Sequence, residues 1–127
     1  MTAEALKSTA EKLVAHCRAG TTEDGLTELY DPAAVSVESA PAPGQDSAET
    51  HGLDGIRGKH AWWSGAMEVH SAGADGPFLH GPDRFAVIFD FDATNKASGE
   101  RVQMHEVAIY TVNPAGKITR EEFFYNL

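Results

Sequence analysis

Three long segments near the end of the chain limit the possible folds most strongly. Residues 84–94, 101–112 and 117–125 each mix apolar and polar side chains in the way that β-strands do. Short connections at Asn95–Gly99 and Asn113–Gly116 join them, and both contain the glycine and asparagine that favour hairpin turns. Strands joined by hairpins run antiparallel, so this part of the chain predicts an antiparallel sheet.

The first half of the chain is expected to be mainly helical. Apolar residues from Thr2 to Ala19 recur at helical spacing, with Thr2 able to cap the start and Gly20 the end. A second helix is predicted from about Glu23 to Tyr30, with Thr22 as its cap, and a third roughly from Asp54 to Gly65.

Shorter segments connect these helices to the long strands. Val35 and Val37 alternate with polar residues and predict a short strand, and residues 67–74 predict another. Residues 39–50 are rich in proline, glycine, serine and alanine and indicate a loop, and Asp75-Gly76-Pro77 indicates a turn. Helices followed by antiparallel strands predict an α+β fold, in which the helices cover one face of a curved sheet. We expect one domain over residues 1–127.

Composition excludes several classes of partner. The formal net charge of −9 disfavours nucleic acids and anionic membranes, which are bound by basic surfaces. The longest apolar run, Phe85–Phe89, is far too short to span a bilayer, and the first twenty residues lack the apolar core of a signal peptide. We therefore expect a cytoplasmic protein. The single cysteine, Cys17, lies on the apolar side of the first helix and is expected to pack in the core.

Three stretches carry a resemblance to a known family: 53-LDGIRGKHAWW-63, 84-RFAVIFDFDATNKASGER-101 and 104-MHEVAIYTVNPAGKITREEFFY-125. With the order of elements, they resemble the SnoaL-like group of the nuclear-transport-factor-2-like, or ketosteroid isomerase-like, superfamily. The resemblance implies a cone: a curved sheet forming a half-barrel, about three covering helices and one enclosed pocket. It also implies a homodimer.

The same resemblance gives expectations about function. The superfamily includes isomerases, dehydratases, polyketide cyclases and binding domains without known activity. The tyrosine and two aspartates of ketosteroid isomerase have no clear counterparts here, so the resemblance extends to the fold and not to a catalytic set. It implies an isomerase, cyclase or dehydratase acting on an apolar carbonyl compound; the alternative is a non-catalytic module that binds a hydrophobic small molecule. No cofactor is expected.

The candidate catalytic residues are carboxylates on the last strands. If Val112 pairs with Lys117, then Glu106 and Glu121 share one face, with Glu106 opposite Phe123. Apolar surroundings raise a carboxyl pKa and suit it to proton transfer, whereas solvation or pairing with an arginine would give these residues a structural role. Asp90 is a third candidate, and Asp92 is better explained by the adjacent turn. The expected ligand-binding residues are Glu38, Trp62, Trp63, His70, Met104, Tyr110, Phe123 and Tyr125.

Two other features are interpreted as structural. The six histidines lack the close spacing of a zinc site, so we expect no metal. The opposite face of the last strands carries Val107, Ile109, Ile118 and Phe124, which predicts an apolar dimer contact.

Overall fold

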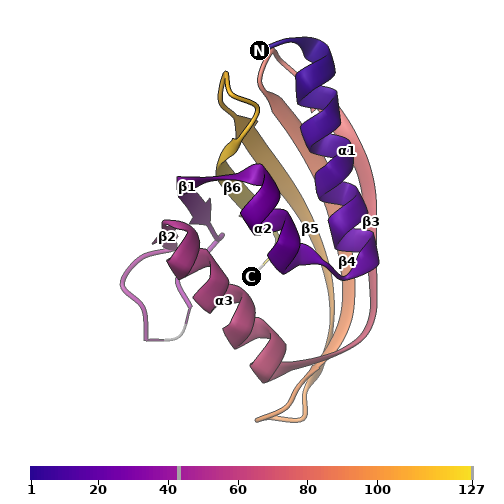
Figure 1. Ribbon diagram of the computed structural model, residues 1–127. Coiled ribbons are helices and arrows are strands. Elements are labelled where there is room, and N and C mark those ends of the chain that lie inside the picture. Colours follow the sequence, from indigo (N-terminus) through magenta and orange to yellow (C-terminus); the bar gives the residue numbers. More distant parts are fainter. Residues whose placement is uncertain (43, 127) are drawn as a thin grey trace.

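The computed structural model, which describes residues 1–42 and 44–126, contains three helices and a six-stranded sheet. Figure 1 shows these elements along the chain. Their bounds are α1 Ala3–Ala19, α2 Thr22–Leu29, β1 Tyr30–Val37, β2 Glu49–His51, α3 Leu53–Ala66, β3 Met67–His80, β4 Arg84–Asn95, β5 Arg101–Val112 and β6 Ile118–Phe124.

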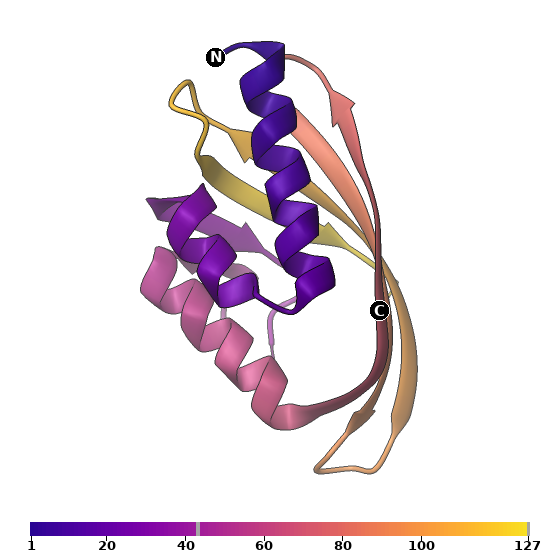
Figure 2. The same ribbon diagram turned by 45° about the vertical axis from the view of Figure 1, so that its right-hand side comes forward.

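The sheet has the strand order β2-β1-β6-β5-β4-β3 and is open, with β2 and β3 at its edges. All three helices lie on its concave side, and the long strands bend around them (Figure 2). The predicted α+β class, with helices on one face of a curved sheet, is confirmed. The sheet is mixed, however, because β1 and β6 run parallel. Hairpin turns determine the direction of neighbouring strands in the sequence, but they say nothing about two strands that lie at opposite ends of the chain.

Helix α1 begins and ends at the residues that its predicted caps, Thr2 and Gly20, indicate. The Thr2 side chain accepts a hydrogen bond from the Ala5 backbone N–H at 3.1 Å, and Gly20 takes the left-handed conformation with φ 72°. The expected cap of α2 at Thr22 is wrong, because Thr22 is the first helical residue. Thr21 precedes it, and its hydroxyl accepts no capping hydrogen bond.

Two glycines give a matched test of these helix assignments. Gly20→Ala is expected to destabilise the protein by about 1 kcal/mol, because a left-handed backbone is strained for alanine. Gly58→Ala, inside α3 where an added methyl group has open space, is expected to stabilise it by about 0.5–1 kcal/mol through helix propensity. Urea unfolding of both variants measures the two changes; equal effects of the same sign would contradict the assignment.

Two connections differ from the prediction. Residues 75–77, expected as a turn, lie within the long strand β3, whose pairing with β4 becomes irregular between Asp75 and Phe78. The predicted loop over residues 39–50 contributes the start of β2, which pairs with the end of β1. Pro43, within that loop, lies outside the described residues.

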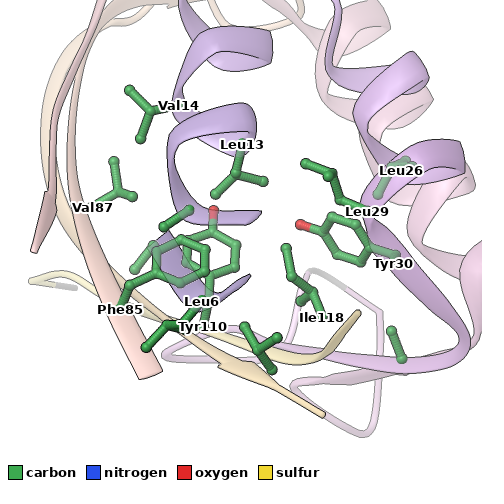
Figure 3. Close-up of a cluster of buried hydrophobic side chains, with 14 of the residues drawn as sticks. Leu6, Leu13, Val14, Leu26, Leu29, Tyr30, Phe85, Val87, Tyr110 and Ile118 are labelled. Atoms are coloured by element: carbon green, nitrogen blue, oxygen red, sulfur yellow. The ribbon is translucent and has the colours of Figure 1, made fainter. Parts of the chain in front are cut away.

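The core lies between α1, α2 and the concave side of β4–β6. Phe85 and Tyr110 stack with ring centroids 4.8 Å apart, and Figure 3 shows Leu6, Leu13 and Ile118 around them. Cys17 packs against this cluster, as predicted. Burial, followed by the charge of Glu121, raises the pKa of its thiol to about 11. None of the helices in the described part of the chain is long and apolar enough to cross a membrane.

Candidate functional site

The strands β5 and β6 pair in a register that differs from the predicted one. Val112 lies opposite Ile118 rather than Lys117, and Tyr110, not Ala108, lies opposite Glu121. Thr119 is an extra residue between these pairs, and the Asn113 side chain accepts hydrogen bonds from the backbone of Ala115 and Lys117, which closes the turn one residue later. Turn length alone does not reveal such a bulge.

This bulge decides which β6 residues face the core. Ile118 and Glu121 are three residues apart, yet both are buried on the interior face. Ile118 was expected on the outward face as part of a dimer contact; that expectation is wrong, because the bulge turns the side chain inward. The predicted pairing of Glu106 with Phe123 is also wrong, since Phe123 lies opposite Ala108. Glu106 lies opposite Phe89 of β4.

Glu121 forms a buried pair with Tyr30. Its side chain is 3% exposed, and the Tyr30 hydroxyl donates to Glu121 Oε2 at 2.6 Å. This distance is typical of a hydroxyl that donates to an ionised carboxylate. The second oxygen, Oε1, is buried and has no hydrogen-bond partner among the described residues. Glu121 therefore presents one unsatisfied acceptor inside the protein.

Two phenols beside Glu121 remain neutral donors. Burial raises the pKa of both Tyr30 and Tyr110 well above its ordinary value, and the charge of Glu121 raises it further. Tyr30 lies at the start of β1, directly after α2, whereas Tyr110 lies near the end of β5. Figure 3 shows both rings inside the fold.

Glu106, on β5, has a carboxyl group with a raised pKa. Burial raises its pKa from 4.5 to about 7, the charges of Glu38 and Glu121 raise it as well, and Lys59 lowers it. A group with this pKa exchanges its proton near neutral pH.

A second cluster lies next to Glu106. Lys59 of α3 forms an ion pair with Glu38 at 2.7 Å and donates to Ser36 Oγ at 2.7 Å. Its ammonium also lies 4.9 Å from the centroid of the Phe123 ring. Burial, then the charge of Glu38 and a hydrogen bond to it, raises the pKa of Tyr125 to about 12. The sequence analysis missed Lys59 and Ser36, because their partners are distant in the chain and no local spacing indicates them.

Aromatic side chains border the carboxylates. Trp63 of α3 packs edge-on against Phe91 with centroids 5.8 Å apart, and Phe89 lies 6.1 Å from Phe91. Met104, also predicted here, is half-buried and lies opposite Phe91 on β5. Trp62 was expected to share this wall, but it is 57% exposed. Consecutive helical residues point about 100° apart, so only one tryptophan of the pair can face the sheet.

Two other predicted residues, Asp90 and His70, also lie away from the site. Asp90 pairs with His105 on the outward face of the sheet, because its neighbours Phe89 and Phe91 take the inward positions. His70 is exposed, and its Nε2 atom forms a hydrogen bond with Thr94 Oγ1 at 2.7 Å. Neither Asp90 nor His70 is therefore brought together with Glu106.

Asp92 is held in place by Arg101. The guanidinium donates to both carboxylate oxygens, at 2.9 and 2.8 Å, across the β4–β5 hairpin. This bidentate hydrogen bond holds the pKa of Asp92 below its ordinary value. The pair supports the structural interpretation of Asp92 and places it outside the Glu106 cluster.

Depressions on the outer surface lie elsewhere. One runs along α1 and is lined by Glu4, Lys7, Ser8, Glu11, Lys12 and Ala15; another lies at the start of α3 and is lined by Pro32, His51, Gly52, Leu53, Asp54 and Arg57. Neither includes Glu106 or Glu121. No group of three or more histidine, cysteine, aspartate or glutamate residues in the described part of the chain is arranged to hold a metal ion.

Glu106 is expected to make stability depend on pH. A folded-state pKa of about 7 lies above the value of 4.5 for the unfolded chain, so its contribution is fully present below about pH 4.5 and is lost as pH rises through 7. Glu106→Gln should therefore be more stable than the wild type at pH 8, by about 1–3 kcal/mol after allowance for partial exposure, and should lose that advantage at low pH. Urea unfolding across pH measures the difference; a constant difference would contradict the raised pKa.

Comparison with known proteins agrees with this fold. Residues 5–125 match the family described as the SnoaL-like domain, and the chain belongs to that family. A candidate SnoaL-like polyketide cyclase from Mesorhizobium loti is 37% identical, with a TM-score of 0.86 over 98% of this chain and 100% of its own. No protein with a curated functional description matches the chain.

More distant structures share the fold alone. The Δ5-3-ketosteroid isomerase of a Mycobacterium species is 19% identical, with a TM-score of 0.67 over 96% of this chain and 93% of its own. The Mycobacterium tuberculosis protein RV0760c, in complex with estradiol-17beta-hemisuccinate, is also 19% identical, with a TM-score of 0.70 over 96% and 92%. The chain is therefore a SnoaL-like protein with the nuclear-transport-factor-2-like fold.

Proposed function

We propose that this protein binds a hydrophobic carbonyl compound and moves a proton at the carbon next to the carbonyl group, as an isomerase, cyclase or dehydratase would. The observation that carries the proposal is the pKa of about 7 for Glu106, on the face that also holds the Tyr30–Glu121 pair. A carboxyl group is most effective in general acid–base catalysis when its pKa lies near the working pH.

In the proposed step, the ionised Glu106 takes the proton from the carbon, and the electrons of the C–H bond move into the enolate. Tyr110 and Tyr125, both neutral, are the candidate donors to the enolate oxygen. Glu106 then returns the proton to the same or a conjugated carbon, so atoms and electrons balance without a cofactor. Trp63, Phe89 and Phe91 supply apolar surface for the body of the substrate.

Proton exchange on a simple ketone tests this proposal. Tetralone in heavy water is expected to lose its α-proton signal faster with the protein than in buffer, and Glu106→Gln should slow the exchange about a hundredfold or more. His70→Gln, which changes an exposed residue away from the site, is the control. Tetralone that binds without faster exchange would favour the alternative, a non-catalytic binding module; tetralone that neither binds nor exchanges would contradict both functions.

We also propose that two copies of the protein form a homodimer through the outward face of the sheet. Val107 and Phe124 lie opposite each other there and are 40% and 50% exposed, and Phe78 is 47% exposed. Association of two copies would remove this apolar surface from water. Sedimentation equilibrium at tens of micromolar should show a dimer that Val107→Asp dissociates; a monomeric wild type would contradict the proposal. A single domain over residues 1–127 and a cytoplasmic location stay predictions.

A further inference from the structure

Carboxylates outnumber cations on the interior face. Glu38, Glu106 and Glu121 contribute three acidic groups, and Lys59 contributes a cation that pairs with Glu38 and lowers the pKa of Glu106. Lys59 is already engaged, because it pairs with Glu38 at 2.7 Å. Among the described residues, neither Glu106 nor Glu121 forms a salt bridge. Glu106 and Glu121 are close enough for Glu121 to raise the pKa of Glu106, and among the described residues neither has a cation paired with it alone.

Glu121 supplies an independent sign of a missing partner. Only 3% of Glu121 is exposed, and within the described part of the chain its Oε1 atom has no hydrogen-bond partner, while Oε2 accepts from the Tyr30 hydroxyl. A buried carboxylate oxygen without a hydrogen-bond donor destabilises the folded protein. A ligand that brings a donor and a positive charge would satisfy both the oxygen and the charge balance.

We propose that this site takes a hydrophobic amine, whose ammonium group donates to Glu121 Oε1 and lies beside Glu106. The inference rests on the proposed function in that both use the same interior face. It narrows the substrate class to a molecule with an apolar body and a protonated nitrogen. The rings of Phe89, Phe91 and Trp63 supply apolar surface for the body of such a ligand.

The bound amine would also change the pKa of Glu106. The groups that face this carboxyl are Glu38 directly after β1, Lys59 of α3 and Glu121 of β6, with the neutral phenols of Tyr110 and Tyr125. An ammonium group beside it would lower its pKa from about 7, so Glu106 would release its proton when the ligand binds. Binding would thereby convert Glu106 into the base that the proposed reaction needs.

Three probes of matched shape test the inference: naphthylmethylamine, naphthylmethanol and ethylnaphthalene. At about pH 8 the amine should bind the wild-type protein about tenfold more tightly than the alcohol, as one charge-assisted hydrogen bond implies. Its affinity should rise about tenfold from pH 6 to pH 8, because the bound state holds fewer protons. In the wild type, the pKa of Glu106 measured by NMR should fall when the amine is bound.

Two variants distinguish specific binding of the amine at this site from a general attraction of the positive amine to a protein with a net charge of −9. Glu121→Gln should abolish the preference for the amine, and Glu106→Gln should abolish the pH dependence of its affinity. An amine preference that survives in Glu121→Gln, or an unchanged Glu106 pKa on binding, would overturn the inference. Equal affinity for amine and alcohol would overturn it while leaving the proposed function intact, whereas no binding by any probe would count against the proposed function itself.

Discussion

Replacing Phe85 with alanine is expected to lower the free energy of unfolding by about 3–5 kcal/mol. The Phe85 ring is fully buried and stacks on Tyr110 with centroids 4.8 Å apart, so its removal leaves a cavity between α1 and the sheet. Urea unfolding measures the change. Leu79→Ala is the control, since Leu79 is 44% exposed and should cost far less. A similar loss for both variants would show that Phe85 is not a core residue.

Replacing Tyr30 with phenylalanine is expected to destabilise the protein by about 3 kcal/mol. The substitution removes one hydroxyl group, but with it goes the one hydrogen bond that the buried Glu121 carboxylate makes among the described residues. The energetic cost is therefore mainly that of an unpaired buried charge.

A double-mutant cycle separates this cost from a simple packing change. Tyr30→Phe combined with Glu121→Leu should be more stable than Tyr30→Phe alone, because an apolar pair leaves no unsatisfied polar group. If the two changes destabilise additively in urea unfolding, the Tyr30–Glu121 pair is not coupled and Glu121 is hydrated rather than buried.

Local signals predicted the elements of this fold well. Thr2 and Gly20 defined α1, and the alternation from Arg101 to Val112 gave the bounds of β5. These features depend on residues close together in the chain. The parallel contact of β1 with β6 and the bulge at Thr119 depend on distant packing and on backbone detail, which alternation does not encode.

The candidate site, like the fold, could be predicted only where it depends on residues close together in the chain. The sequence analysis placed Glu106 and Glu121 on one face through a pairing of Val112 with Lys117. That pairing is wrong, but Glu121 lies opposite Tyr110 and raises the pKa of Glu106. Alternation without the strand register left Asp90 as a third candidate, although its side chain points outward. The Tyr30–Glu121 and Lys59–Ser36 contacts join different elements, so only the assembled structure reveals which groups satisfy, or fail to satisfy, each carboxylate.

The most direct test of this account is the titration of Glu106, followed by carbon-detected NMR of its side-chain carboxyl carbon. The account predicts a midpoint at about pH 7, which should move higher in Lys59→Met because the Lys59 ammonium lowers the pKa of Glu106. A midpoint near 4.5, unaffected by Lys59→Met, would identify Glu106 as a solvated carboxylate and contradict the proposed site.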